Sequence, residues 1–537
     1  MGSKVPSDKF SRELVRELLI AISYSVPDTD LNVEHASKNI EGPNGSAVPK
    51  TDGAEKYRSE LISISYAQLP DDQVPPVVLG NHEAVQAEIS ATRTNLKMIE
   101  IKSEIVSRQT IKPSTPTPPH LKTFKLSLLD QISPAIHGNM TFFYPSTHTS
   151  HDFFHKSKLL QHSISKTLSL FYPLAGRLRD AATIDCNDQG AFFVEAKVNI
   201  QLPHFVNPPD SDLMDHFLPT TDPTTLELSN DAMFLVRFTS FSCGGVAISL
   251  SLTHKLFDVS ALLTLLQTWS SVCRGLTDPI TPILIGEKFL APRDELSATS
   301  ATVNIVAEKF VQRRFVFTAS NITELKSKVD KEFHKELQSH PSRVEVVLAL
   351  LWKCAVAAKK QKTGSFGPSA LFQAVNLRKR LSPPLPETAV GNFIWPFMVF
   401  AYEEKDLELH EAVVQMRKRL NEFNNTKASM FRGEGATSAI MVAMKERAVF
   451  FRNNKEMTVY RCSSWCKFPL YDTDFGWGKP LWHVSVNKLV SNTIALADTR
   501  SGDGIEALMT LDEEEMALFE QNEQLLKYAS INPSIYA

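Results

Sequence analysis

Apolar and polar residues follow two different periods along the chain from residue 98 onward. Apolar positions alternate with polar ones in MIEIKSEIVSRQT (98–110), as in a β-strand. AFFVEAKV (191–198) and VAISLSLT (246–253), which consist mostly of apolar or small residues, also read as strands. Apolar residues recur at helical intervals in 157–171 and 258–269. Because strands and helices are mixed without a strict βαβ rhythm, the pattern predicts an α/β fold with large mixed β-sheets flanked by helices.

The second half of the chain repeats this mixture. Segment 313–329 predicts a strand followed by a helix that is capped at Ser320 or Asn321, with Glu324 in its first turn. A further strand is expected after the Gly-Asn turn of ETAVGNFIWPFMVFAY (387–402). The two halves are therefore predicted to be built in the same style.

Composition divides the chain into four parts. Residues 1–97 hold four aromatic residues and neither Trp nor Cys, in a chain with 32 Phe, 10 Tyr and 6 Trp. Such a segment buries too little apolar surface to offset its ordering entropy, so we expect a mostly disordered extension. Proline and charge return at 276–305, which predicts a crossover linker between an N-terminal domain at 98–275 and a C-terminal domain at 306–537.

The extension contains a short repeat. ELLIAISYSVPD (17–28) and ELISISYAQLPD (60–71) are hydrophobic stretches that each end in Pro-Asp. Two copies are too few for a self-stacking array. Two interpretations stay open: a leftover or mispredicted exon, or a pair of short motifs that dock on a partner and give the protein a non-catalytic binding or scaffold role.

Charge, hydropathy and cysteine content exclude several classes of function. A net charge of −3 leaves no basic footprint for nucleic acid or an anionic membrane surface. The sequence has no run of about 18 apolar residues, so no membrane span is expected. The six cysteines form no C-x-x-C pair, which argues against a metal site. Few cysteines and no export signal predict a cytoplasmic protein, and no oligomerisation signal is visible, so we expect a monomer.

Two His-x-x-x-Asp pairs are candidate chemistry. His254 and Asp258 follow an apolar strand and precede a helix with a buried stripe, so a rigid element positions them. If the helix has already begun, the pair shares a face at about 5–6 Å between Cβ atoms. His148 and Asp152 lie in a Ser/Thr-rich stretch with no rigid element before it. Context therefore favours His254, although a histidine that merely fits the end of a strand is the alternative.

Two other motifs are weak, and a third is absent from the sequence. Asp474–Gly476 reads DFG, but the remaining protein-kinase motifs are absent from the sequence. GDGIEA (502–507) matches a loose dinucleotide-binding pattern without the helix that should follow it. No G-x-S-x-G occurs, which excludes a serine hydrolase of the nucleophile-elbow type.

HKLFD (254–258) together with DFGWG (474–478) resembles the plant BAHD acyltransferases, and FYPLAGRL (171–178), VNLRKR (375–380) and GNFIWP (391–396) support the resemblance in the same order. It covers about residues 98–530. It implies two chloramphenicol-acetyltransferase-like domains with a solvent channel between them. Val259 stands where the common form has Gly, as in the branch that uses acetyl-CoA to acetylate alkaloids, terpenoids and volatile alcohols.

The resemblance also implies roles for individual residues. His254 would be the general base, and Asp258 would turn from the substrate and pair with Arg378 as a structural brace. Asp474, Phe475, Gly476, Trp477 and Gly478 would shape the CoA side of the molecule without touching the reacting atoms. From the chemistry alone, the tetrahedral oxyanion needs hydrogen-bond donors, which backbone amides or the regions of Asn392 and Trp477 could supply.

The implied reaction moves an acyl group, acetyl by preference, from acyl-CoA to the hydroxyl of a plant specialised metabolite. A neutral imidazole can accept the hydroxyl proton as the bond to the thioester carbon forms, which typically accelerates a reaction by about 10²–10⁴. No resident cofactor or metal is expected, and the partners are acyl-CoA and a small-molecule alcohol. A hydroxycinnamoyl- or benzoyl-CoA transferase and an N-acyltransferase of the same fold are the alternatives.

Overall fold

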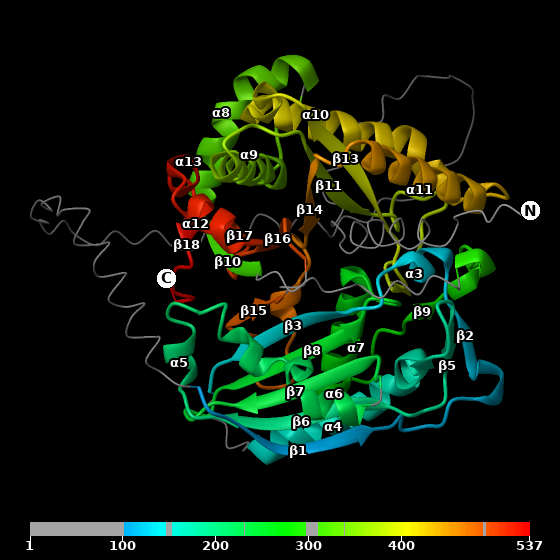
Figure 1. The fold of residues 1–537 in the computed structure, drawn as a ribbon. Helices are drawn as coiled ribbons and strands as arrows, with labels where there is room; N and C mark the ends of the chain where they lie inside the picture. The colour runs from blue at the N-terminus through cyan, green and yellow to red at the C-terminus, as the bar shows by residue number, and fades with distance from the viewer. Residues whose placement is uncertain are drawn as a thin grey trace, which may run out of the picture. The chain divides into compact units, whose positions relative to one another are not determined.

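The computed structural model describes residues 101–146, 153–229, 231–296, 310–337, 339–486 and 490–536. Two large β-sheets with flanking helices make up this part of the chain (Figure 1). The predicted α/β class with large mixed sheets is therefore confirmed. The extension at 1–97 with its repeat, and the pair His148 and Asp152, lie outside the described residues.

The first sheet has six strands in the order β1-β6-β7-β8-β3-β15. Neighbouring strands within this sheet run antiparallel, except β6 and β7, which run parallel to each other. All eight residues of β8 are buried, which explains why they are apolar or small. The strands are β1 Ser103–Ile111, β3 His137–Tyr144, β6 Ala191–Val198, β7 Phe234–Ser240, β8 Val246–Thr253 and β15 Trp482–Val484.

The second sheet has seven strands in the order β13-β11-β14-β16-β17-β10-β18. Strand β14 runs parallel to both of its neighbours, and the other pairs are antiparallel. The strands are β10 Phe310–Phe317, β11 Ser369–Asn376, β13 Ile394–Ala401, β14 Thr458–Ser464, β16 Thr493–Asp498, β17 Ile505–Asp512 and β18 Ser530–Ile531. Smaller sheets contain β2 Thr123–Lys125, β4 Arg177–Leu178 and β5 Thr183–Asp185, and β9 Ile283–Leu284 with β12 Ala389–Val390.

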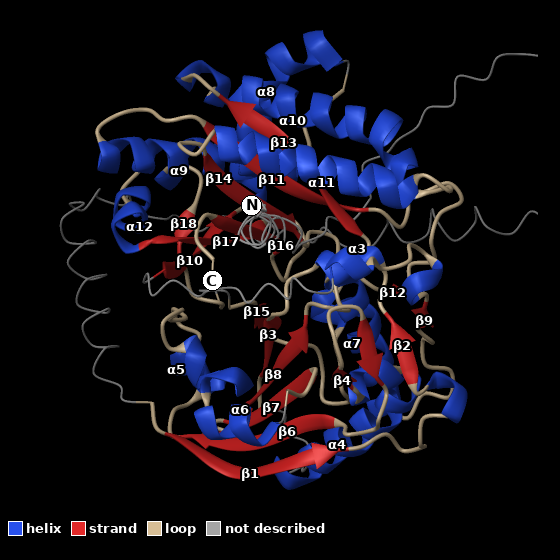
Figure 2. Cartoon of the chain, turned by 45° about the vertical axis from the view of Figure 1, so that its right-hand side comes forward, coloured by secondary structure: helices blue, strands red, loops and turns tan. Residues whose placement is uncertain are grey.

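Helices pack on the sheets in two groups. The first group is α3 Leu128–Ile132, α4 Phe153–Leu170, α5 Leu202–Phe205, α6 Pro223–Ser229 and α7 Val259–Cys273. The second is α8 Ala319–Leu337, α9 Arg343–Thr363, α10 Leu409–Glu422, α11 Ala436–Asn453, α12 Glu513–Glu520 and α13 Glu523–Leu526. Figure 2 shows α9, α10 and α11 beside strands of the second sheet. Trp269 of α7 and Trp352 of α9 are fully buried anchors of these layers.

Helix α8 begins earlier than the sequence suggested. It starts at Ala319, and the hydroxyl of Thr318 accepts a hydrogen bond from the Asn321 amide at 3.2 Å. Thr318 therefore fills the capping role that we expected of Ser320 or Asn321, and Glu324 lies beyond the first turn. Thr318, Ser320 and Asn321 are all good N-cap residues and lie within four positions, so the residue types alone do not show which of them caps the helix.

Strand β15 comes from the C-terminal half of the chain but extends the first sheet. Trp482 pairs with Phe143 of β3, and their rings stack with centroids 5.4 Å apart. The Trp482 indole donates a 3.2 Å hydrogen bond to Glu506 of β17, which also pairs with the buried Arg314. The division of the chain at 276–305 stays a prediction, and its last part, 297–305, lies outside the described residues.

A buried histidine in β15 makes stability depend on pH. Burial lowers the pKa of His483 to about 4, while nearby Glu506 opposes this shift. An unfolded histidine titrates near pH 6.5, so between about pH 6.5 and 4 the unfolded chain binds a proton that the folded chain does not. The free energy of unfolding therefore falls as the pH falls through this window, by about 2–3 kcal/mol at its lower end.

Thermal unfolding of His483→Phe between pH 7.5 and 4.5 tests this assignment. We expect the variant to lose less melting temperature on acidification than the wild type, because its side chain cannot titrate. His120→Gln, at an exposed histidine, serves as the control and follows the wild-type curve. Parallel curves for His483→Phe and the wild type would contradict the assignment.

Candidate active site

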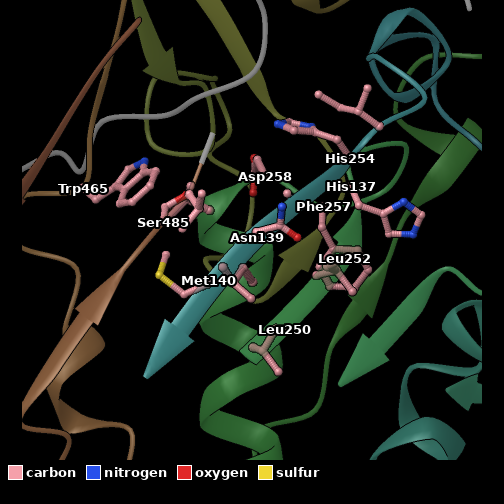
Figure 3. A pocket seen from close by; sticks show the side chains of 15 residues that line it. His137, Asn139, Met140, Leu250, Leu252, His254, Phe257, Asp258, Trp465 and Ser485 are labelled. Atoms are coloured by element: carbon pink, nitrogen blue, oxygen red, sulfur yellow. The ribbon is translucent and has the colours of Figure 1, made fainter. Parts of the chain in front are cut away.

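A pocket lies beside the end of β8 and the start of β3. The space that it encloses is about 730 Å³, a figure that includes volume open to solvent. Figure 3 shows His254, Asp258, Asn139 and Ser485 among the side chains around it. Its apolar lining residues are Ile136, Met140, Leu250, Leu252, Phe257, Val259, Leu262, Trp465 and Val486. Among the described residues that line the pocket there is no Lys or Arg.

His254 follows directly on β8 and lines this pocket. Only 7% of the residue is exposed. Its backbone amide donates a 2.8 Å hydrogen bond to the carbonyl of Ile136, and its carbonyl accepts one from the Asn392 side-chain amide, also at 2.8 Å. Both backbone groups of the histidine are therefore held, and the imidazole can reach the pocket from a rigid support.

Asp258 is bound on every side. Its two oxygens accept hydrogen bonds from the Arg378 guanidinium at 2.7 and 3.0 Å. They also accept bonds from the backbone amides of Ala261 at 2.8 Å and Phe393 at 3.1 Å. Arg378 is 1% exposed, and its remaining donors reach backbone carbonyls that include Ala389. The structure thus brings the two predicted brace residues together in a buried, two-bond ion pair.

His254 and Asp258 do not share a helical face, because the helix has not yet begun at these two residues. Asp258 is the N-cap, and α7 starts at Val259. A turn separates the end of β8 from this cap, so the pair is set by the loop and by Arg378 rather than by helical spacing. Val259 has no positive φ, so the usual glycine is not needed for the helix to begin here.

A three-residue segment, 391–393, was missed as a unit by the sequence reasoning. Gly391 accepts from Arg378 through its carbonyl at 3.2 Å, Asn392 bonds His254, and the Phe393 amide bonds Asp258. The segment follows β12, which pairs with β9 from the predicted linker. The sequence marked it through the Gly-Asn turn and the motif GNFIWP (391–396), which indicate a bend and a family resemblance but not what the bend contacts.

Asn392 does not offer its side chain to an oxyanion, as the sequence reasoning had suggested for its region. The amide nitrogen donates to Asp130 at 3.0 Å and to the His254 carbonyl at 2.8 Å. Both hydrogens of the NH₂ group are used by these two acceptors. Asn392 is fully buried, so its role is structural.

The five residues 474–478 form a turn that packs on the first sheet's core. One Asp474 oxygen accepts hydrogen bonds from the amides of Gly476 at 2.7 Å and Gly478 at 2.9 Å. Both glycines have positive φ, +107° and +99°, which other residues adopt only with strain. Phe475 meets Trp269 edge to face, with ring centroids 4.6 Å apart. Of the described residues that line the pocket, none belongs to this turn.

Buried cysteines and groups of His, Cys, Asp and Glu are further candidate sites of chemistry in the part of the chain that the structure describes. Burial raises the pKa of Cys354 and of Cys466 to about 12, so these thiols stay protonated at neutral pH. No cluster of three or more His, Cys, Asp or Glu among the described residues could hold a metal ion. Across those same residues, no helix has both the length and the apolarity that a membrane crossing requires.

Two family models match the chain. One, described as the Transferase family, matches residues 101–526. The other is described as a family of unknown function (DUF6865) and matches residues 3–74, which include both copies of the short repeat. The match to the first model covers the first large sheet, the second large sheet except β18, and the pocket.

Named plant proteins are similar over most of the chain. Akuammiline synthase 1 of Alstonia scholaris is 36% identical over 427 residues, which are 79% of this chain and 97% of that protein. Limonoid 7-O-acetyltransferase of Citrus sinensis is 36% identical over 460 residues, covering 81% of this chain and 99% of that protein. The crystal structure of vinorine synthase superposes with a TM-score of 0.70 at 32% identity, over 81% of this chain and 100% of that chain.

A more distant structure shares the fold alone. TRI101 of F. sporotrichioides, crystallised with coenzyme A and T-2, superposes with a TM-score of 0.59 at 15% identity. The alignment covers 76% of this chain and 99% of that one.

Gly391 tests whether segment 391–393 supports the pocket. Its φ is +149°, and an added Cβ would lie 2.8 Å from the Phe393 ring. We expect Gly391→Ala to lower the free energy of unfolding by about 1–3 kcal/mol, because alanine is strained at this φ. We also expect lower activity, because the strained backbone lies between the Gly391 carbonyl that binds Arg378 and the Phe393 amide that binds Asp258. Chemical denaturation and a turnover assay check both effects. Gly367→Ala, where an added Cβ meets open space, is the control and stays close to wild type; equal behaviour of the two variants would contradict the expectation.

Proposed function

The chain belongs to the plant BAHD acyltransferases, and we propose that it transfers an acetyl group from acetyl-CoA to a hydroxyl of a specialised metabolite, with His254 as general base. Family membership makes the protein an acyltransferase that uses acyl-CoA and a small-molecule acceptor. Acetyl as the transferred group, the kind of acceptor and the role of each residue are our inferences.

The observation that carries the assignment is the placement of His254. It lines the pocket, while hydrogen bonds from two distant segments hold its backbone. An alcohol has a pKa far above 7 and attacks a thioester slowly, so a fixed base that accepts its proton lowers the barrier. Fixed placement adds to this, because an error of about 1 Å in the position of a reacting group can cost about 10² in rate.

The proton and the electrons balance without a covalent enzyme intermediate. The hydroxyl oxygen bonds to the thioester carbon while the imidazole of His254 takes the hydroxyl proton. The carbon–sulfur bond then breaks, and the imidazolium returns the proton to the CoA thiolate. A cysteine nucleophile is not required, and the raised thiol pKa values of the buried cysteines argue against one.

The other predicted site residues would act through structure. We infer that Asp258 and Arg378 hold the loop that carries His254, since the carboxylate also caps α7. We further infer that the turn at 474–478 shapes the side of the molecule that takes CoA, because it is rigid and packs on the core next to Trp269.

Acetyl is favoured as the transferred group by two observations. Citrus sinensis and Melia azedarach proteins at 34–36% identity are named limonoid or epi-neemfruitin B O-acetyltransferases. A malonyl group carries a carboxylate, and the described lining of the pocket holds no Lys or Arg to receive it. The N-malonyltransferase of Strychnos nux-vomica, 35% identical, keeps malonyl transfer to nitrogen as the competing outcome.

The lining also favours a neutral, largely apolar acceptor. Asp258 is the one carboxylate among the described lining residues, and Arg378 already neutralises it. A charged acceptor would lose its hydration in the pocket without gaining an oppositely charged partner, which opposes binding. A fused-ring alcohol would bury apolar surface there, which favours binding. Asn139 and Ser485 are polar groups that can orient such a ligand.

We also propose that the protein is cytoplasmic, since all six cysteines are unpaired, as in a reducing compartment. A monomeric state stays a prediction from the sequence.

His254→Ala is the direct test of the base. We expect kcat to fall by about 10²–10⁴, with much smaller changes in KM, when release of CoA from acetyl-CoA is followed in the presence of an accepted alcohol. His137→Gln is a matched control, because His137 lines the same pocket but its ring bonds the Ala232 carbonyl at 3.0 Å and points away from Asn139 and Ser485 in Figure 3. Full activity of His254→Ala would refute the assignment.

A donor and acceptor panel tests the substrate class. Acetyl-, malonyl-, benzoyl- and hydroxycinnamoyl-CoA are each combined with neutral polycyclic alcohols, hydroxy acids and amines, and products are identified by mass spectrometry. We expect acetyl esters of the neutral alcohols to exceed all other products by at least about tenfold, the ratio that 1.4 kcal/mol provides. Preferred acylation of a hydroxy acid or an amine would overturn the assignment of the acceptor.

A further inference from the structure

Asp130 is a completely enclosed carboxylate outside the pocket. It is 1% exposed and belongs to α3, where the Ser127 hydroxyl donates to it at 2.6 Å and the Ser127 amide at 3.1 Å. Its other oxygen accepts two bonds from Asn392, from the backbone amide at 2.7 Å and from the side-chain nitrogen at 3.0 Å. Asn392 is 262 residues away from Asp130 in the sequence, so the carboxylate joins α3 to the segment at 391–393.

The bonds to Asn392 fix which way its amide points. The side-chain nitrogen has two neighbours, the His254 carbonyl and the Asp130 carboxylate, and a carbonyl and an ionised carboxylate can only accept hydrogen bonds. The nitrogen must therefore face both, and a flipped amide would set oxygen against oxygen. Asp130 in this way determines that Asn392 donates to His254.

The surroundings favour a charged Asp130 only in part. Burial raises its pKa, and the bonds from Ser127 and Asn392 oppose that shift. The neighbouring positive group is Lys255, the residue after His254, whose ammonium donates to the Gln131 carbonyl at 2.7 Å. Burial lowers the pKa of Lys255 to about 8, and attraction to Asp130 opposes this. A carboxylate is costly to bury, and here the four hydrogen bonds from Ser127 and Asn392 offset that cost.

We propose that Asp130 is a positioning residue for acyl transfer, which acts by orienting Asn392 so that the Asn392 amide holds the His254 carbonyl. This inference rests on the proposed role of His254. The His254 amide is bound to Ile136, a few residues after α3, so the α3 region controls both backbone groups of the base. Loss of the carboxylate would let the His254 peptide rotate and would move its ring relative to the hydroxyl that it must deprotonate.

A cycle of four proteins tests the proposal: wild type, Asp130→Asn, His254→Ala and the double variant. Asp130→Asn has the same shape as the wild-type side chain. Its NH₂ group, however, faces either the Ser127 donors or the Asn392 donors, where the carboxylate presented an acceptor. We expect it to lower kcat by about 10–100-fold while KM for acetyl-CoA and alcohol changes less than about threefold. In the His254→Ala background we expect Asp130→Asn to change the residual rate by less than about twofold, because the residue acts through the missing imidazole.

Two outcomes overturn the proposal: a kcat of Asp130→Asn within about twofold of wild type, or an equal fall in both backgrounds, which would mean a general structural role. Full activity of His254→Ala would instead refute the base itself, so the two failures differ. If Asp130→Asn does not fold, Asn392→Ala replaces it in the cycle with the same expectations, because it removes the donor to His254 and keeps the backbone bond to Asp130.

Ser127→Ala is the matched structural control. It removes the hydroxyl that bonds the other Asp130 oxygen and breaks the capping box of α3, but it leaves the bonds to Asn392. We expect a lower melting temperature and a kcat within about twofold of wild type. A fall in kcat as large as that of Asp130→Asn would show that lost stability explains both, and would overturn the positioning role.

Discussion

The buried ion pair between Asp258 and Arg378 is the interaction on which the site depends. It joins residues 120 positions apart, with both side chains at most 1% exposed. Removing two charges from water costs several kcal/mol for each ion, so such a pair is tolerable only when every donor and acceptor is used. Here the carboxylate is satisfied by Arg378 and two backbone amides, and the guanidinium by carbonyls of the 389–391 region. Either residue alone would be a buried, uncompensated charge.

This constraint explains why the site is assembled from distant parts of the chain. The end of β8 supplies His254, the N-cap of α7 supplies Asp258, and the segment at 391–393 binds both. Short pairing of β9 with β12 holds the start of that segment. Polar bonds therefore lock the loop that carries the histidine, whereas the pocket beside it remains apolar. A rigid polar support under an apolar pocket suits an enzyme that must align an uncharged acceptor with a base.

Much of the fold could be read from local patterns. The strands β6 and β8 and the helix α7 appear where the apolar pattern predicted them, because burial of one or both faces of an element imposes a period on its apolar residues. The cap of α8 was misplaced, because Thr318, Ser320 and Asn321 are chemically interchangeable there and the backbone selects among them. The extension of the first sheet by β15 had no local signal, since three residues of strand carry no period.

By itself the sequence determined the α/β class and the family, because two motifs with a large separation are specific, whereas the choice of His254 over His148 stays a prediction. The tertiary structure decided what those residues touch. It showed that the Asn392 side chain donates to both Asp130 and the His254 carbonyl, and that Val259 begins α7 without a positive φ. These facts depend on hydrogen bonds between residues more than 100 positions apart, and such contacts leave no period or composition in one chain from which to infer them.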